Sequence, residues 1–221
     1  MKRSARTSRF EPRWPVAITI LTLLFLLAVL PDRIRLYPSW LAYVVGIAVL
    51  SPLTGVGLTS ARQWWRRVER IVILIFVVVV GAGILVNLAN LTVKMLSGSA
   101  HTSGLQLLTS SIALWATNVF VFSLLYWQID RGGPEVRIDG GGSRPDWLFP
   151  QVGAPVEDVP RDWHPVFVDY LYLSYSTATA FSTTEVAPLT PRAKLMMMLQ
   201  SMISLVTIVL VASRAINILG S

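Results

Sequence analysis

Residues 174–194, SYSTATAFSTTEVAPLTPRAK, form an unusually polar segment directly before the last apolar run of the chain. Seven of the eleven residues from Ser174 to Thr184 are Ser or Thr. In a membrane helix, such hydroxyls can bond the carbonyl three or four residues earlier, bridge neighbouring helices, or face water. This density exceeds what helix packing usually needs, and the carboxylate of Glu185 is costly at membrane depth unless it faces a bundle interior or a watery cavity. The segment therefore predicts a wet lining rather than a lipid-facing helix.

The rest of the chain is apolar enough for an integral membrane protein. Of 221 residues, 53% are hydrophobic and 14% are charged, whereas soluble domains carry about 25% charged residues. Several apolar runs approach the roughly 20 helical residues that cross a hydrocarbon core. We therefore expect an all-α membrane protein of five or six transmembrane segments. The expected segments are residues 15–30, 40–58, 71–95, 105–127 and 193–219, with the polar residues 166–187 as a sixth helix or a re-entrant, pore-like segment.

Composition divides the chain into three regions. Residues 1–128 are expected to form a four-helix transmembrane region with a basic N-terminus. Residues 166–221 are expected to form a pore-like helix, a turn and the final transmembrane helix. Between them, residues 129–165 are hydrophilic, rich in Gly and Pro, and contain seven of the twelve acids. That composition is typical of an irregular loop with little core of its own.

Basic residues flank the apolar runs unevenly. With a cytoplasmic N-terminus, thirteen Lys and Arg residues fall in cytoplasmic segments, and only Arg33 and Arg35 fall in outside loops. This asymmetry is what the positive-inside rule expects. If residues 166–187 cross fully, the protein has six helices and Arg192 and Lys194 lie outside. If they re-enter from the cytoplasm, it has five crossings and these two residues stay inside, and the charge count does not separate the two topologies. A conventional outside-facing pore loop is a third topology, and it would invert every other loop.

Composition also argues against several classes of function. The net charge of +7 does not indicate nucleic-acid binding, because the basic residues lie beside apolar runs rather than on a soluble face. The chain has no cysteine, which excludes disulfides, thiol catalysis and Cys-ligated metal. No set of nucleophile, base and acid is recognisable, so we do not expect an enzyme. His101 and His164 would need further close ligands to hold a metal, and we expect neither a metal nor a cofactor.

The segment YLYLSYSTATAFSTTEVAPLTPRAKL resembles the pore segment of tetrameric cation channels of the potassium-channel type. In that family an aromatic-rich pore helix leads into a T-V-G-Y-G-D filter, a turn, a basic residue and the inner helix. The match has no gaps and covers residues 166–216. Tyr172, Ser174, Thr177 and Thr179 correspond to the pore helix, and Glu185 corresponds to the acid of the filter. The turn is reproduced by Pro188, Leu189 and Thr190.

The filter itself departs from the family pattern. The family's glycines align with Ser182 and Thr184, and its tyrosine aligns with Thr183. Potassium selectivity depends on backbone carbonyls that point at the ion, and the glycines adopt backbone angles that Ser and Thr resist. The resemblance therefore implies a pore lined by hydroxyls and a ring of Glu185 carboxylates, suited to weakly selective passage of monovalent cations. The pore-lining candidates are Thr177, Thr179, Ser182, Thr183, Thr184 and Glu185.

The whole chain, LLYWQIDRGGP and DYLYLSYSTATAF in particular, is also similar to bacterial inner-membrane proteins grouped only as a domain of unknown function. That similarity implies a bacterial cytoplasmic membrane and leaves the activity open. We expect a channel-like homo-oligomer, a tetramer if it follows the channel family, that is embedded in a lipid bilayer and passes monovalent cations. The alternative is a non-conducting scaffold or accessory subunit whose hydroxyls hold helices together.

Polar residues within the apolar runs have two interpretations. Asn87, Asn90 and Asn118 can form a shared polar pathway or, more simply, hydrogen bonds between helices. Asp130 and Arg131 follow the fourth apolar run directly. We expect them to form an ion pair at the membrane surface, where that helix ends.

Overall fold

The computed structural model describes residues 11–29, 46–49, 51, 63–96, 104–138, 144–155, 157–160, 163–179 and 186–219. Within these ranges the chain is mostly helical, as expected. The helices are α1 Trp14–Val29, α3 Gln63–Leu96, α4 Gly104–Ile129, α5 Pro134–Ile138, α6 Phe167–Thr179 and α7 Pro191–Leu219. The remaining elements are the 3-10 turns Asp130–Gly132 and Pro150–Gly153 and the strands β1 Trp147–Leu148 and β2 Ala187–Pro188.

Three of the described helices are long and apolar enough to cross a membrane. Their candidate spans are Arg67–Asn90, Leu108–Gly132 and Pro191–Ala212, which coincide with three of the expected runs. α1 is apolar but has only 16 residues. Of the run expected at residues 40–58, the description covers 46–49 and 51, which are helical. The three spans support the assignment of the chain as a membrane protein.

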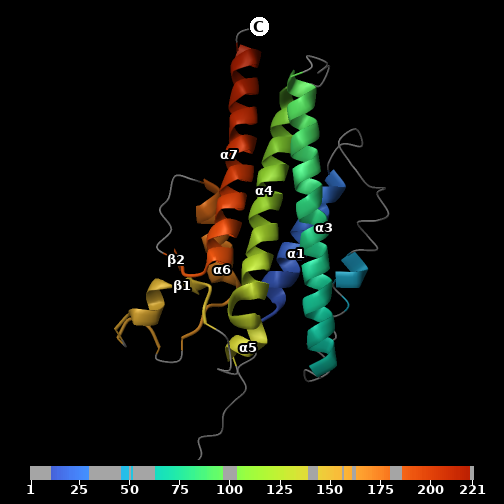
Figure 1. Ribbon diagram of the computed structural model, residues 1–221. Coiled ribbons are helices and arrows are strands. Elements are labelled where there is room, and N and C mark those ends of the chain that lie inside the picture. The colour runs from blue at the N-terminus through green and yellow to red at the C-terminus, as the bar shows by residue number, and fades with distance from the viewer. Residues whose placement is uncertain are drawn as a thin grey trace, which may run out of the picture.

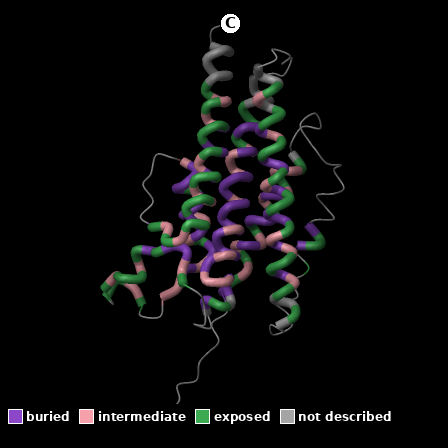
Figure 2. The backbone as a smooth tube through the Cα atoms, in the orientation of Figure 1, coloured by how far each residue is buried: buried purple, intermediate pink, exposed green. Residues whose placement is uncertain are grey.

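α4 forms the centre of the helix bundle (Figure 1), where it contacts α1, α3, α6 and α7. Figure 2 shows an almost continuous buried stretch along α4. About half of the α4 span, 56%, is buried, compared with 22% of the α7 span. The large side chains of Tyr126 and Trp127 near its end are fully buried. α4 is therefore the element against which the other helices are positioned.

α7 turns its polar face inward and its apolar face outward. Gln200, Ser204 and Thr207 are buried in the bundle, whereas Leu195 and Met202 are 64% and 63% exposed. A surface helix of a soluble protein shows the opposite arrangement. Large exposed apolar faces mark contact with a membrane or with another protein, so the outer face of α7 fits a lipid environment.

α6 and α7 begin at the same end of the bundle. α6 has 13 residues, about 20 Å at 1.5 Å per residue. β2, which precedes α7, pairs antiparallel with β1 in the register Trp147↔Pro188 and Leu148↔Ala187. In Figure 1, α6 rises part-way beside α7, and the β1–β2 pair lies at the base of both helices. The starts of α6 and α7 therefore lie at the same end of the bundle.

The loop between α4 and α6 packs into the bundle through its aromatic residues. Trp147 is fully buried, with its ring centroid 4.7 Å from that of Tyr126 and 6.5 Å from that of Tyr170. The ring of Phe149 is also buried and lies 5.3 Å from that of Tyr170. These side chains belong to the core of the helix bundle and fix the position of β1.

Candidate functional site

The first turn of α6 is held by two carboxylates. The backbone N–H of Phe167 donates to Oε1 of Glu11 at 2.7 Å, and the N–H of Val166 donates to Oδ2 of Asp169 at 2.7 Å. The unpaired N–H groups and positive partial charge of a helix N-terminus favour carboxylates there. Burial raises the pKa of Asp169, against the opposing effects of the Val166 hydrogen bond and the charge of His164. The start of α6 is thus tied to the segment before α1.

The last turn of α6 lies inside the bundle, where side chains bond its carbonyls. The hydroxyl of Thr179 donates to the carbonyl three residues earlier at 3.1 Å. Ser201 of α7 donates to the carbonyl of Thr177 at 3.3 Å, and the indole N–H of Trp115 in α4 donates to the carbonyl of Ala178 at 3.4 Å. The last four carbonyls of a helix have no partner within it, and burying them unpaired is costly. These side chains therefore allow α6 to end inside the protein.

Midway along α6, Ser174 joins three helices. Its hydroxyl donates to the carbonyl of Val119 in α4 at 2.6 Å. The Nε2 group of Gln200 in α7 donates to the carbonyl and the hydroxyl of Ser174 at 2.9 and 2.7 Å. The hydroxyl of Tyr126 in α4 donates to Oε1 of Gln200 at 2.6 Å. Because all these groups are buried, the junction fixes the position of α6 between α4 and α7.

Asn118 adds a second bridge between α4 and α7. Its Nδ2 group donates to the carbonyl of Gln200 at 3.2 Å and to the hydroxyl of Ser204 at 2.9 Å. The expectation of interhelical hydrogen bonding is confirmed for this residue.

The structure describes two of the six pore-lining candidates. Thr177 is buried, and its hydroxyl donates to the carbonyl of Leu173 in its own helix at 2.8 Å. Thr179 is half-buried and bonds as described above. Both hydroxyls are therefore used within α6. The other candidates, Ser182, Thr183, Thr184 and Glu185, lie outside the described residues.

The expected turn at Pro188, Leu189 and Thr190 is anchored by Asp146 of the preceding loop. The N–H of Leu189 donates to the carbonyl of Asp146 at 2.8 Å, and the hydroxyl of Thr190 donates to its carboxylate at 2.6 Å. Oγ1 of Thr190 also accepts the N–H of Ala193 at 3.3 Å, which is the bonding pattern of a helix N-cap. Asp146 therefore fixes where α7 begins.

The carboxylate of Asp146 belongs to a larger polar group, the Asp130–Asp146 cluster. Nε and Nη2 of Arg192 approach its two oxygens; the carboxylate is fully buried and the guanidinium is 55% exposed. The N–H of Asp146 donates to Oδ1 of Asp130 at 2.8 Å, and the hydroxyl of Tyr170 donates to Oδ2 at 2.5 Å. Burial raises the pKa of Tyr170, which keeps the phenol protonated as a donor. The cluster joins the end of α4 to the starts of β1, α6 and α7.

Arg137 of α5 lies beside this cluster. Its guanidinium carbon is 4.9 Å from the ring centroid of Tyr170. Nη1 donates to the carbonyls of Trp127 and Asp130 at 2.7 and 3.0 Å, and Nη2 lies 3.9 Å from Oε2 of Glu11. The side chains of Arg137 and Glu11 are almost fully buried. A buried cation over an aromatic face and beside a carboxylate links the N-terminal segment to the Asp130–Asp146 cluster.

The expectation that Asp130 lies at the membrane surface in an ion pair with Arg131 is wrong. Asp130 lies in the interior of the protein. Its carboxylate is fully buried and bonds Tyr170 and Asp146. Arg131 instead adopts a positive φ of 52°, and the two glycines that follow have φ values of 87° and 110°. Glycine accepts such angles without a steric penalty, so the chain reverses sharply after α4 and turns Asp130 into the protein.

Sequence reasoning missed the acids of this cluster because their partners are distant along the chain. Asp146 and Arg192 are 46 residues apart, and Glu11 bonds an amide 156 residues later. One signal was present in the sequence: Asp146 directly precedes Trp147, an aromatic residue within an otherwise hydrophilic loop. A large aromatic side chain in such a loop is usually buried. Burial of Trp147 also places the neighbouring Asp146 in the interior.

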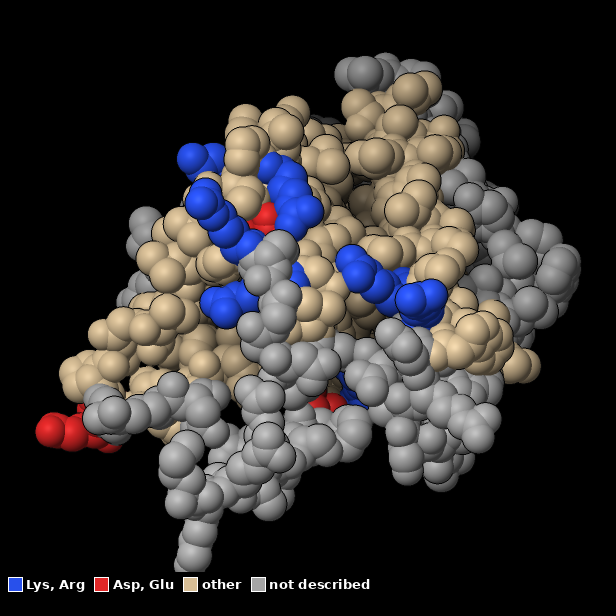
Figure 3. Space-filling view, turned by 60° about the horizontal axis from the view of Figure 1, so that its bottom comes forward, with Lys and Arg blue, Asp and Glu red and all other residues tan. Residues whose placement is uncertain are grey.

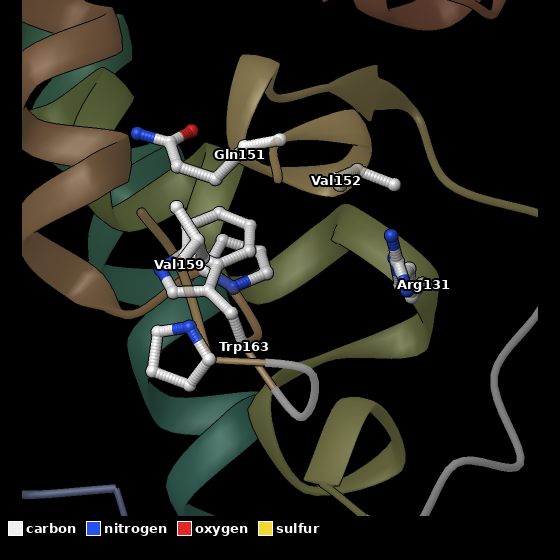
Figure 4. Close-up of a pocket in the computed structure, with 8 residues that line it drawn as sticks. Arg131, Gln151, Val152, Val159 and Trp163 are labelled. Atoms are coloured by element: carbon white, nitrogen blue, oxygen red, sulfur yellow. The ribbon is translucent and has the colours of Figure 1, made fainter. Parts of the chain in front are cut away.

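A hollow of about 470 Å³ lies beside the same loop (Figure 4). Arg131, Gln151 and Trp163 are among its lining residues. In Figure 4 Arg131 and the amide of Gln151 lie on opposite sides of the hollow. The described side chains also include no group of three His, Asp or Glu residues that is arranged to hold a metal ion.

Known proteins provide no template for this arrangement. Comparisons with protein families, with curated proteins and with solved structures found no match for this chain. Its own geometry is therefore the basis for inferring a function.

Proposed function

We propose that the chain is a channel-like membrane protein in which residues 167–190 form a re-entrant pore segment. The observation that carries the proposal is the path of the chain: α6 ends after 13 residues, and α7 starts at the end of the bundle from which α6 entered. Half-helices at membrane depth occur where they are buried in protein or line a water-filled cavity. This path favours five crossings and a re-entrant segment over six full crossings.

The direction of α6 suits a conduit for monovalent cations. A helix C-terminus carries a partial negative charge of about half an elementary charge, and that of α6 lies within the bundle. Residues 182–185 follow it closely in the chain and add three hydroxyls and a carboxylate. These residues contain no glycine, which argues against a potassium-type filter and for weak selectivity.

The basic end of the bundle is proposed to face the cytoplasm of a bacterial inner membrane. Arg192 joins the Asp130–Asp146 cluster at the start of α7, and Arg70 of α3 donates to the carbonyl of Gly132 at 2.7 Å. Both arginines therefore lie at the end where α4 finishes. The positive-inside rule puts such an end in the cytoplasm, together with the N-terminus. By analogy with tetrameric channels, four copies would meet around their re-entrant segments.

A specific observation favours a second candidate, a non-conducting scaffold or accessory subunit. Several hydroxyls of α6 bond carbonyls inside the same chain, Ser174, Thr177 and Thr179 among them. The outward residues of α7, which include Leu195, Met198 and Met202, are apolar and exposed. An inner helix that lines a wet pore needs some polar surface toward the axis, whereas a scaffold embedded in lipid does not.

Cation flux into liposomes distinguishes the two candidates. Purified protein is reconstituted, and the flux of a monovalent cation is measured against protein-free liposomes. The channel proposal predicts flux above this background and a several-fold lower flux for Glu185→Gln, because the variant removes a carboxylate from the conduit. The matched control is Glu157→Gln, an exposed acid in the loop before α6, which should leave the flux unchanged.

The scaffold candidate predicts a different result. Flux would equal that of protein-free liposomes, and Glu185→Gln would have no effect on it. Substitutions in the Ser174 junction would then change the stability or the oligomeric state of the protein without any change in permeability. If the native protein and Glu185→Gln show the same flux, and this flux is above background, Glu185 does not line the conduit.

A further inference from the structure

Exposed side chains of α3 change from charged to apolar within one residue. Arg67 and Arg70 are exposed in the first two turns of the helix. From Ile71 to Ala89 the exposed residues are apolar, with Ile71 at 56% and Ile75 at 58% exposure. Such a change marks the boundary between the headgroup region and the hydrocarbon region of a bilayer.

α7 shows the same change at the same end of the bundle. Arg192 and Lys194 are exposed in its first turn, and the exposed apolar face begins at Leu195. In α1, the exposed ring of Trp14 stands at the corresponding position and precedes the exposed side chain of Ile18. Tryptophan is enriched at membrane interfaces, so three helices indicate the same interfacial level.

Contacts between the helices show that these three changes lie at one end. Arg13, which directly precedes α1, pairs with Glu69 of α3 at 3.5 Å. Glu11 bonds the first amide of α6. Arg192 of α7 bonds Asp146 in the cluster that also holds the start of α6. The charged starts of α1, α3 and α7 therefore form one surface.

At this end of the bundle four acids are buried, whereas several cations are exposed. Glu11, Glu69, Asp130 and Asp146 are all buried. Figure 3, which looks toward this end, shows Lys and Arg side chains in groups on the described surface, with acid visible between two of them and at the left edge of the view. Exposed cations at this end are Arg67, Arg70, Arg144, Arg192 and Lys194.

We infer that this end of the bundle binds the headgroups of anionic phospholipids. Glu11, Glu69 and Asp130 are neutralised or hydrogen-bonded by groups inside the protein, and Asp146 is paired with Arg192. These four acids therefore do not screen Arg67, Arg144 and Lys194. Cations just outside the apolar boundary stand at the depth of lipid phosphates, where each interaction with an anionic leaflet is worth about fivefold in binding. The inference does not depend on whether the re-entrant segment conducts ions.

Lipid selectivity tests this inference. The full chain is reconstituted in phosphatidylcholine bilayers, and electron paramagnetic resonance measures the immobilised fraction of spin-labelled phosphatidylglycerol and phosphatidylcholine. We expect a several-fold preference for phosphatidylglycerol that weakens as the salt concentration rises. This measurement needs no variant, so it stands even if a substitution impairs folding. Equal immobilisation of both lipids, or a preference that salt does not change, would overturn the inference.

A matched pair of variants identifies the residues. The side chains of Arg67, Arg144 and Lys194 are exposed and make no hydrogen bond or ion pair to the other described residues, so their neutralisation leaves the Asp130–Asp146 cluster intact. The variant R67Q/R144Q/K194Q should lose most of this several-fold preference, because it removes three cations from the surface. The charge-preserving variant R67K/R144K/K194R should retain the native preference. An unchanged preference in the neutral variant would contradict the assignment.

Discussion

Asp146 and Arg192, 46 residues apart in the chain, form a two-pronged ion pair in which the carboxylate is fully buried and the guanidinium is 55% exposed. The same carboxylate accepts the hydroxyl of Thr190. The pair thus connects the loop after α4 to the first turn of α7, and it brings the chain back to the end of the bundle where α6 began. This contact places the start of α7 beside the start of α6, which is the basis for proposing a re-entrant path.

Breaking this pair should loosen the start of α7. Arg192→Gln leaves the carboxylate of Asp146 buried without its cation, which costs about 3–5 kcal/mol in fully buried pairs. Because the Arg192 side chain is more than half exposed, we expect about 2 kcal/mol. Denaturant titration in detergent micelles measures the loss. Lys194→Gln, two residues away, should change the free energy of unfolding by less than about 0.5 kcal/mol.

A double-mutant cycle checks that the effect belongs to the pair. Asp146→Asn and Arg192→Gln should each destabilise the protein, and the double variant should cost less than the two single costs added together, because each single variant already removes the interaction. Additive costs would show that the two side chains act independently.

Replacement of Glu11 should destabilise the first turn of α6. Glu11→Ala takes away the acceptor for the N–H groups of Phe167 and Trp127. Each buried donor left without a partner costs about 1–3 kcal/mol. Glu11→Gln keeps an acceptor oxygen and loses only the charge beside Arg137, so its effect should be smaller. Faster hydrogen exchange at the Phe167 amide in Glu11→Ala is the direct readout, and equal exchange in both variants would contradict a capping role.

The hydrogen bonds around Gln200, which join different helices, should contribute more to stability than hydroxyls that bond within their own helix. Gln200→Leu leaves the buried hydroxyl of Tyr126 without its acceptor and removes the donor to Ser174. We expect a loss of about 2–4 kcal/mol in stability. The control is Thr207→Val, which is nearly the same shape and removes only a bond to the carbonyl of Ile203 in the same helix. That variant should lie within about 0.5 kcal/mol of the native protein, and similar losses in both would contradict the expected difference.

Cysteine labelling tests the re-entrant path, and the chain has no native cysteine to interfere. Single cysteines at Asp158 and Leu189, both exposed, should react with a membrane-impermeant maleimide from the same side. A cysteine at Ser221, beyond the end of α7, should react from the opposite side. Met198 lies on the exposed apolar face of α7, and a cysteine there should react from neither side. Labelling of positions 158 and 189 from opposite sides would show a full crossing by residues 166–187.

The long apolar helices were predictable from the sequence. The runs at residues 71–95, 105–127 and 193–219 fall within α3, α4 and α7, because sustained hydropathy is a property of local composition. The polarity of α6 was also predictable, but the hydrogen-bond partners of its hydroxyls were not. Ser174 bonds Val119 and Gln200, which lie 55 residues before it and 26 residues after it. No local pattern contains that information.

The sequence by itself determined that this chain has membrane-length apolar helices, a basic end and one segment rich in hydroxyls, since each follows from which residues are neighbours along the chain. Only the tertiary structure decided that α7 begins at the end of the bundle where α6 begins. That choice rests on Asp130, Asp146 and Arg192, whose charges are stable in the interior only when the loop, α4 and α7 are already together. The apolar runs determine which segments can enter the membrane, and the buried charges determine where α7 begins.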